Sequence, residues 1–179
     1  MKAAFIGRFQ PFHQGHHHAI EKCREEFDEL KIVIGSAETS RTEKNPLKAE
    51  EREEIIRSCF PEIEITYIED EERDDEGNRK WIKKLEQKTD AEVLITQNDL
   101  VKSLAEKHTN LEVREHELYE KELYSGTEVR RRIRSGEEWR YLVPGCAKES
   151  IEEKVEYIKE SGVQYDFEPG WNPENAYNS

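Results

Sequence analysis

The sequence has few of the residues that would place it in several common protein classes. It contains three cysteines and one methionine, and no apolar run approaches the ~20 residues of a membrane span. The cysteines Cys23, Cys59 and Cys146 are widely spaced, odd in number and without a C-x-x-C pair, which argues against a disulfide framework and against a zinc ribbon. We also expect no signal peptide. These features predict a protein of the cytoplasm with no membrane partner.

Basic residues are also in the minority. There are 28 of them against 41 acids, so the formal net charge is −13, which argues against a general nucleic-acid binder. Leu, Ile, Val and Phe together number 38, just above the level at which a highly charged chain is expected to be disordered. The 179 residues therefore predict one domain with a small core.

Short apolar runs alternate with helical patterns along the chain. Strands are expected at residues 2–6, 31–34, 63–68, 92–96 and, weakly, 111–114. Helices are expected from residue 16 to about 30, before residue 60, at 79–87, at 99–107, from 125 to 136, and as one helix carrying Ile151, Val155 and Ile158. This rhythm predicts an α/β fold: a Rossmann-like, doubly wound parallel sheet with helices on both faces, which binds ligands beyond the carboxyl ends of its strands. Residues 161–179 show no periodicity and predict an irregular C-terminal arm.

The segment G-R-F-Q-P-F-H-Q-G-H at residues 7–16 follows the first expected strand. His13 and His16 lie at the entry to a helix, whose free N–H groups and partial positive charge favour phosphate. Gly15 lets a ligand approach the backbone closely. Local capping or packing by His13 is the alternative. A metal site at residues 16–18 is disfavoured, because successive helical side chains point about 100° apart. Neither a dinucleotide-binding glycine motif nor a P-loop occurs.

A basic motif, S-G-T-E-V-R-R-R-I-R, occupies residues 125–134. Ser125 is placed to cap a helix, and the four arginines create a local positive field in an acidic chain. Arginine gives planar, bidentate donors to phosphate oxygens, which favours Arg130 as a phosphate ligand. The alternative is a surface helix whose arginines pair with Glu128, Glu137 and Glu138. We expect Arg131, Arg132 and Arg134 to be structural or interfacial.

Asp74, Asn78 and Trp81 lie between the third expected strand and the next helix. A tryptophan face suits a flat cationic ring, Asn78 can bond an amide, and Asp74 can bond or counterbalance the same ligand. The alternative is that Trp81 packs in the core and that Asp74 belongs to a solvated acidic loop.

Taken in order, these motifs resemble those of the H-x-G-H nucleotidyltransferases, and the R-F-Q form is similar to that of the archaeal-type nicotinamide-mononucleotide (NMN) adenylyltransferases. The likeness extends to I-G-S-A at 34–37, Ser40, N-P at 45–46, E-R at 51–52, Asn98, L-V at 100–101, Y-S-G-T-E-V-R-R at 124–131 and W-x-x-L-V-P at 139–144. The resemblance covers residues 2–158. It implies a nucleotidyltransferase domain over residues 1–160 and a homohexamer.

The resemblance implies transfer of the AMP moiety of ATP to NMN, which gives NAD and pyrophosphate. It implies catalytic roles for Arg8, His13, His16 and Arg130. ATP and its phosphates would contact Gly7, Phe9, Gly15, Arg41, Ser125, Gly126 and Thr127, with Lys44 and Lys48 as auxiliaries. NMN would contact Asp74, Asn78 and Trp81. Mg²⁺ would be held mainly by the substrate and water, with no metal site on the protein.

The chain departs from the family pattern in three places. Arg41 replaces a histidine, K-A-E-E-R at 48–52 replaces T-A-G-E-R, and Asp99 replaces a proline. These departures concern substrate specificity more than reaction type. Two alternatives therefore remain. One is a related nucleotidyltransferase that acts on another acceptor, namely FMN, phosphopantetheine or a CTP-dependent substrate. The other is a nucleotide-binding regulator without turnover. The preference between nicotinamide and nicotinate also stays open.

Overall fold

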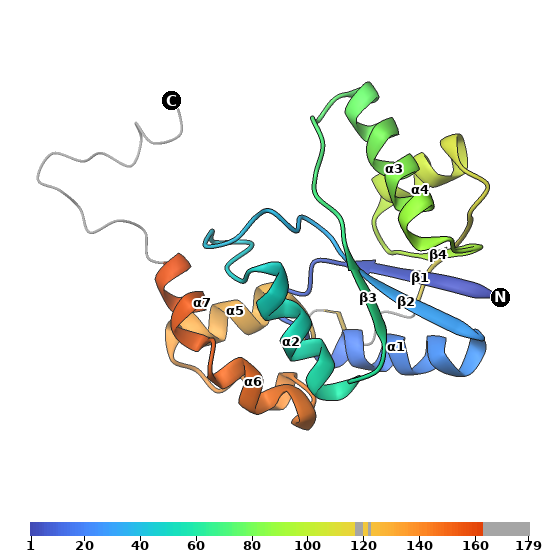
Figure 1. The fold of residues 1–179 in the computed structure, drawn as a ribbon. Coiled ribbons are helices and arrows are strands. Elements are labelled where there is room, and N and C mark those ends of the chain that lie inside the picture. The colour runs from blue at the N-terminus through green and yellow to red at the C-terminus, as the bar shows by residue number, and fades with distance from the viewer. Residues whose placement is uncertain (117–119, 122, 163–179) are drawn as a thin grey trace, which may run out of the picture.

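Five short strands form one parallel sheet in the order β3-β2-β1-β4-β5 (Figure 1). The computed structural model describes residues 1–116, 120–121 and 123–162. The strands are β1 (Lys2–Gly7), β2 (Glu29–Ile34), β3 (Glu64–Tyr67), β4 (Val93–Ile95) and β5 (Glu112–Arg114). In the register of the central strand, Phe5 lies opposite Ile32 on one side and Ile95 on the other. The strand order reverses next to β1, so the end of β1 is where a doubly wound sheet binds ligands.

Helices cover both faces of the sheet, as predicted. They are α1 (Gln14–Glu26), α2 (Ala49–Cys59), α3 (Asp75–Thr89), α4 (Asp99–His108), α5 (Gly126–Ser135), α6 (Lys148–Glu152) and α7 (Val155–Gly162), with short 3₁₀ turns η1 (Arg140–Leu142) and η2 (Gly145–Ala147). One apolar cluster packs α1, α2, α5 and the C-terminal helices against the sheet, and a second packs α3 and α4 on the other side (Figure 1). This arrangement confirms the predicted fold class.

Several boundaries differ from the sequence expectation. Helix α1 begins at Gln14 because His13 caps it, and it ends at Glu26, with Phe27 as an extended C-cap and Leu30 already in β2. The single helix expected near Ile151 and Ile158 is two helices, α6 and α7. The N–H of Lys154 bonds the carbonyl of Ile151, three residues back, which tightens the chain between them.

A disulfide joins Cys59 at the end of α2 to Cys146 in η2, which corrects the expectation from the cysteine count. The two residues are 87 apart in sequence, but the folding of the C-terminal segment onto α2 brings their Cα atoms to 5.2 Å. Spacing along the chain cannot reveal such a pairing. The third cysteine, Cys23, is free and buried.

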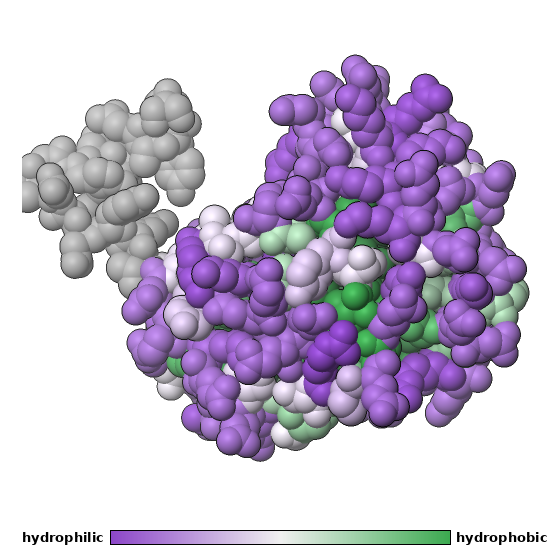
Figure 2. Space-filling view, in the orientation of Figure 1, coloured by the Kyte–Doolittle hydropathy of each residue, from purple (hydrophilic) through white to green (hydrophobic). Residues whose placement is uncertain are grey.

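Hydrophilic residues cover most of the face in Figure 2, and the hydrophobic ones gather near its middle. Among the described residues, no helix combines the length and the apolar character that crossing a bilayer requires. The proposed arm, apart from residues 161–162 at the end of α7, lies outside the described residues.

Candidate active site

A pocket of about 800 Å³ lies between the segment that follows β1 and helix α5. We call it the arginine pocket. Five cationic side chains and one carboxylate line it, so a chain of net charge −13 is locally positive here. Such a surface attracts a polyanion. Its lining is Arg8, Phe9, Gln10, His13, His16, Glu43, Lys44, Gly126, Thr127, Arg130, Arg131, Arg134 and Ser135.

The two predicted histidines form a reciprocal cap at the start of α1. The N–H of Gly15 donates to Nδ1 of His13 (3.0 Å), and the N–H of His13 donates to Nδ1 of His16 (3.3 Å). Because Nδ1 accepts in both rings, each neutral imidazole carries its proton on Nε2. The ring centroids are 3.7 Å apart. His13 thus caps the helix, which was the alternative interpretation, and also lines the arginine pocket.

Burial keeps both imidazoles neutral. It lowers the pKa of His13 to about 3, with a smaller contribution from His116, and it lowers the pKa of His16 well below its ordinary value, with contributions from His13 and His116. At neutral pH each ring therefore offers one N–H donor and no positive charge. The positive charge of the pocket comes from the arginines and Lys44.

Arg130 connects α5 to the segment after β1. Its Nη1 donates to the carbonyl of Gln10 (2.7 Å), and its Nη2 lies 3.4 Å from Oγ1 of Thr127. Burial, and then the nearby Arg134 and Arg8, lower the pKa of Arg130 to about 10, so it remains protonated at neutral pH. A Cβ on Gly126 would lie 3.0 Å from Nη1 of Arg130, and glycine therefore permits this approach.

The other arginines of α5 divide into two groups. Arg131 and Arg132 pair with Glu128, each at 2.8 Å, as the surface-helix interpretation predicts. Arg134 donates to the carbonyls of Glu43 (2.7 Å) and Ile158 (3.0 Å). Both Arg131 and Arg134 line the arginine pocket, a position that the sequence analysis did not assign to them.

A smaller pocket of about 270 Å³ adjoins the first and is called the central pocket. It shares His13, His16 and Gly126 with the arginine pocket. The predicted Gly15 lines it, and a Cβ there would lie 2.9 Å from Cε1 of His13. The N-cap Ser125, whose Oγ accepts the N–H of Glu128, is also in the lining. The remaining members are Phe5, Ile6, Thr96, Gln97, Asn98, His116, Lys121 and Tyr124.

A third pocket of about 630 Å³, the tryptophan pocket, lies between the ends of β1 and β2 and the helices α3 and α4. It contains the predicted Gly7, Asn78 and Trp81 and shares Arg8 with the arginine pocket. Nε1 of Trp81 is buried and has no hydrogen-bond partner among the described residues. A buried indole N–H normally has one, so the pocket offers the ring of Trp81 rather than its N–H to a ligand. The rest of the lining is Ile6, Gly35, Ser36, Asp70, Glu71, Arg73, Thr96, Asn98, Leu100, Val101 and Leu104.

Asp74 does not reach the tryptophan pocket. Its carboxylate caps α3 and accepts the N–H of Gly77 at 2.7 Å. The cap fixes the start of the helix that carries Asn78 and Trp81, and this is the contact that the structure gives Asp74.

The chain is similar in sequence to known proteins over most of its length. The profile of the cytidylyltransferase-like family matches residues 4–132. The nicotinamide-nucleotide adenylyltransferase of Haloarcula marismortui is 37% identical over 154 residues, which is 86% of this chain and 81% of that protein. The enzyme of the same name from Methanosarcina acetivorans is 38% identical over 86% of this chain and 88% of its own length. The chain belongs to the nicotinamide-nucleotide adenylyltransferase family.

Solved structures show the same nucleotidyltransferase fold at low identity. A bifunctional NMN adenylyltransferase/ADP-ribose pyrophosphatase from Francisella tularensis, complexed with AMP and a Mn ion, superposes with a TM-score of 0.70 at 19% identity. Thermotoga maritima TmcAL, bound with alpha-thio ATP, gives 0.66 at 14%. The superpositions cover 90% and 87% of this adenylyltransferase-family chain but only 51% and 56% of those proteins, so the chain spans about half of their length.

The family motifs after β2 serve the site indirectly. Arg41 pairs with Glu51 through both guanidinium nitrogens (2.8 and 2.9 Å) and lies over the ring of Tyr157, outside the three pockets. One residue whose structural role the sequence analysis overlooked is Arg52. It is fully buried and donates to the carbonyls of Arg8 and Gly35 (3.0 and 2.8 Å). Its place in the E-R motif of this adenylyltransferase family was the available signal.

Gln10 was also overlooked. Its side chain is buried, donates to the carbonyl of Leu47 and accepts the N–H of the same residue, both at 2.9 Å. It therefore fastens the loop before α2 to the segment whose carbonyl holds Arg130. Gln10 belongs to the R-F-Q form of the family motif, but no spacing in the sequence indicates its hydrogen bonds to Leu47.

Proposed function

We propose that this chain transfers the adenylyl group of ATP to NMN, forming NAD and pyrophosphate. The relatives that carry this activity in their names support the proposal. The observation that carries it is the continuity of the pockets. The arginine and central pockets share His13 and His16, and the arginine and tryptophan pockets share Arg8. A nucleotide and an acceptor can therefore meet beside the histidines.

The chemistry of each pocket indicates its substrate group. The arginine pocket takes the triphosphate, because its cations and the α5 N-terminus favour phosphate oxygens. The central pocket takes the adenosine, with Gly15 permitting close approach. The tryptophan pocket takes NMN. Its cationic ring stacks on Trp81, and the amide of Asn78 can bond its polar groups.

In the reaction, a phosphate oxygen of NMN attacks the α-phosphorus of ATP, the bond from that phosphorus to the bridging oxygen breaks, and pyrophosphate leaves. The attacking oxygen is already anionic, so no protein base is needed. The chain's task is to align two anions and to stabilise the charge that develops. The Nε2–H groups of His13 and His16 donate to α-phosphate oxygens, and Arg8 and Arg130 stabilise the departing pyrophosphate.

A divalent cation fits this site as part of the substrate. Cations dominate the lining of the arginine pocket, and Glu43 is its only carboxylate, which does not make a protein cage for Mg²⁺. Mg²⁺ bound to the triphosphate supplies neutralisation of phosphate charge. Arg8, Arg130 and Lys44 bind the phosphate oxygens that it leaves free.

Product analysis tests the proposal. Purified protein is incubated with Mg²⁺ and either ATP or CTP, against NMN, nicotinate mononucleotide, FMN and phosphopantetheine, and products are identified by mass spectrometry. NAD and pyrophosphate from ATP and NMN are expected. A product from another acceptor or from CTP alone would overturn the assignment in favour of a related transferase. Binding of ATP with no product from any acceptor would indicate a regulator.

The family resemblance also supports a homohexamer and a location in the cytoplasm. Sedimentation velocity at several protein concentrations tests the hexamer, and cell fractionation tests the location. A monomer at micromolar concentration, or recovery with membranes, would contradict them.

A further inference from the structure

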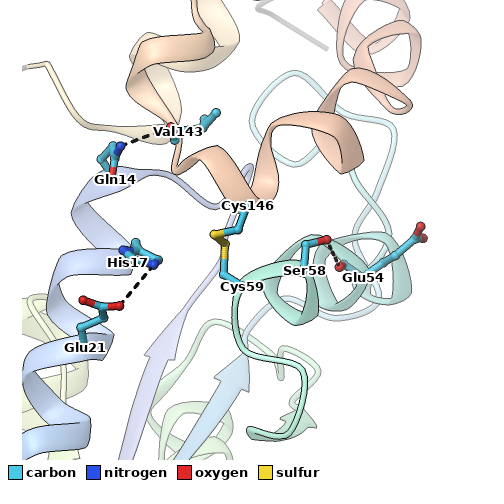
Figure 3. Close-up of a disulfide and its surroundings, with 8 residues drawn as sticks. All are labelled: Gln14, His17, Glu21, Glu54, Ser58, Cys59, Val143 and Cys146. Carbon is cyan, nitrogen blue, oxygen red and sulfur yellow. Dashed lines mark hydrogen bonds and ion pairs between the residues drawn. A yellow bond between two sulfur atoms is a disulfide. The ribbon is translucent and has the colours of Figure 1, made fainter.

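Three chemically reactive side chains meet beside helix α1, and they do not line any of the three pockets described above. They are His17 on α1, Cys59 at the end of α2 and Cys146 in η2 (Figure 3). One imidazole nitrogen and both sulfurs lie within 4.8 Å of one another. The sulfurs are joined as a disulfide in this structure. We call these three residues the Cys–Cys–His cluster.

A disulfide that served only as a crosslink would need no imidazole beside it. Here a histidine from a third element faces both sulfurs, and no step of the proposed reaction uses it. Two thiolates and one imidazole are the donor set that Zn²⁺ and similar thiophilic cations prefer. We propose that, once its disulfide is reduced, the Cys–Cys–His cluster binds a thiophilic divalent cation such as Zn²⁺.

The distances suit such a site. Zn–S bonds of about 2.3 Å in a tetrahedron place two sulfurs about 3.8 Å apart, and the Zn–N bond is only slightly shorter. The nitrogen already lies within 4.8 Å of both sulfurs. Reduction frees the sulfurs to separate by side-chain rotation, since the Cα atoms are 5.2 Å apart.

The surroundings also favour a cation. Glu21 lies one turn along α1, with Oε1 at 3.6 Å from Nε2 of His17, and it adds negative charge next to the histidine. With three protein ligands, water completes the coordination, so the ion is exchangeable.

The change of state balances chemically. A dithiol reductant transfers two electrons and two protons to the disulfide, which gives two cysteine thiols and the oxidised, cyclic form of the reductant. Binding of the cation to the two thiols then releases two protons. Cys146 is exposed and Cys59 half-buried, so both the reductant and the ion have access.

Both states would connect α2 to the C-terminal segment, and only the metal-bound state would also hold α1. His17 follows His16 directly, and its ring stacks on Phe60 at 5.2 Å. Oxidised, the disulfide joins α2 to η2. Reduced and metal-bound, the cluster would in addition hold α1. The cluster is thus a redox-gated metal site, independent of the proposed adenylyl transfer.

Co²⁺, which reports thiolate coordination by its sulfur-to-cobalt absorbance, is the probe. The full chain is reduced anaerobically with a dithiol, freed of it by gel filtration, and titrated with Co²⁺ and then Zn²⁺, with free thiols counted in parallel. We expect a 1:1 complex whose absorbance Zn²⁺ removes, and none in the oxidised protein. No thiolate band in the reduced protein, or an equal band in the oxidised protein, would overturn the proposal.

Variants identify the ligands. Cys146→Ser should abolish the thiolate complex, and Cys59→Ser serves as a second test if either variant folds poorly by circular dichroism. His17→Gln keeps both cysteines and should weaken Co²⁺ binding by at least about tenfold, a loss that even supporting residues of metal sites can cause. His18→Gln, on the same helix but outside the cluster, is the matched control. Equal affinity of the His17 and His18 variants would refute the site.

Discussion

Arg130 provides the sharpest test of the proposed function, because a phosphate ligand and a structural arginine predict different damage. Its guanidinium bonds the neutral carbonyl of Gln10, while burial, and then Arg134 and Arg8 nearby, lower its pKa to about 10. The pocket therefore disfavours this charge in the folded protein. A triphosphate would favour it, and more strongly as charge develops on the leaving pyrophosphate.

For Arg130→Ala, the structure predicts a small loss of stability and a large loss of catalytic efficiency. Loss of the charged hydrogen bond to the carbonyl of Gln10 costs about 1.5–3 kcal/mol, and removal of a desolvated charge next to two arginines offsets much of it. The net change should stay near 1 kcal/mol, a shift in Tm of about 2–4 °C for a chain of this size. Removing one preorganised donor should lower kcat/KM by about 10²–10³, or about 2.7–4 kcal/mol.

Initial rates of NAD formation, with ATP varied at saturating NMN, give kcat/KM, and thermal unfolding gives Tm. Arg130→Lys retains the charge but lacks the bidentate fork, so it should be impaired almost as clearly as Arg130→Ala. Arg132→Ala is the control, since Arg132 pairs with Glu128 outside the arginine pocket. Normal kcat/KM in Arg130→Ala would show that the triphosphate binds elsewhere and that α5 is only a capped helix.

Three further predictions address the other pockets. His16→Ala should fold normally and lose about 10²–10³ in kcat; near-normal turnover would end its assignment. Trp81→Ala should weaken NMN binding by up to about 2 kcal/mol and leave ATP binding unchanged in calorimetry, with Trp81→Phe intermediate; equal weakening for both ligands with a lower Tm would favour core packing. Because His13 stays neutral down to about pH 3 when folded but protonates near 6.5 when unfolded, stability should fall as the pH drops between these values. His13→Gln should reduce this slope by at most about 1.4 kcal/mol per pH unit in acid denaturation, and an unchanged slope would contradict the buried neutral imidazole.

The sequence predicted the fold where local patterns determine it. The apolar runs of the strands and the capping residue Ser125 mark elements through interactions between near neighbours in the chain, and the structure has those elements. The prediction of a single helix near residue 150 was wrong, because the chain breaks at Lys154, whose side chain is buried and bonds the carbonyl of Ser150. Such burial depends on tertiary packing.

Within the site, the sequence predicted the positions that backbone direction alone determines. His13 and His16 follow the central strand β1, so the path of the backbone alone places them at the arginine pocket. Arg41 and Asp74 differ because each side chain has a closer partner: Glu51 bonds the guanidinium, and the N-terminus of α3 bonds the carboxylate. Such competition between partners depends on distances that spacing in the sequence does not give.

The site residues share a physical feature that links the fold to the reaction. Burial holds the imidazoles of His13 and His16 neutral, burial and then the neighbouring arginines disfavour the charge of Arg130, and the indole N–H of Trp81 is buried without a partner among the described residues. Each arrangement costs free energy in the folded protein, and an anionic ligand in the arginine pocket would relieve the cost at the histidines and Arg130. Since the cores around β1 and the buried Arg52 hold these groups in place, the substrates need not reorganise them. The packing of the rest of the fold thus maintains a site whose own residues lower the free energy of unfolding. Binding energy that would otherwise order the site is therefore available for the transition state.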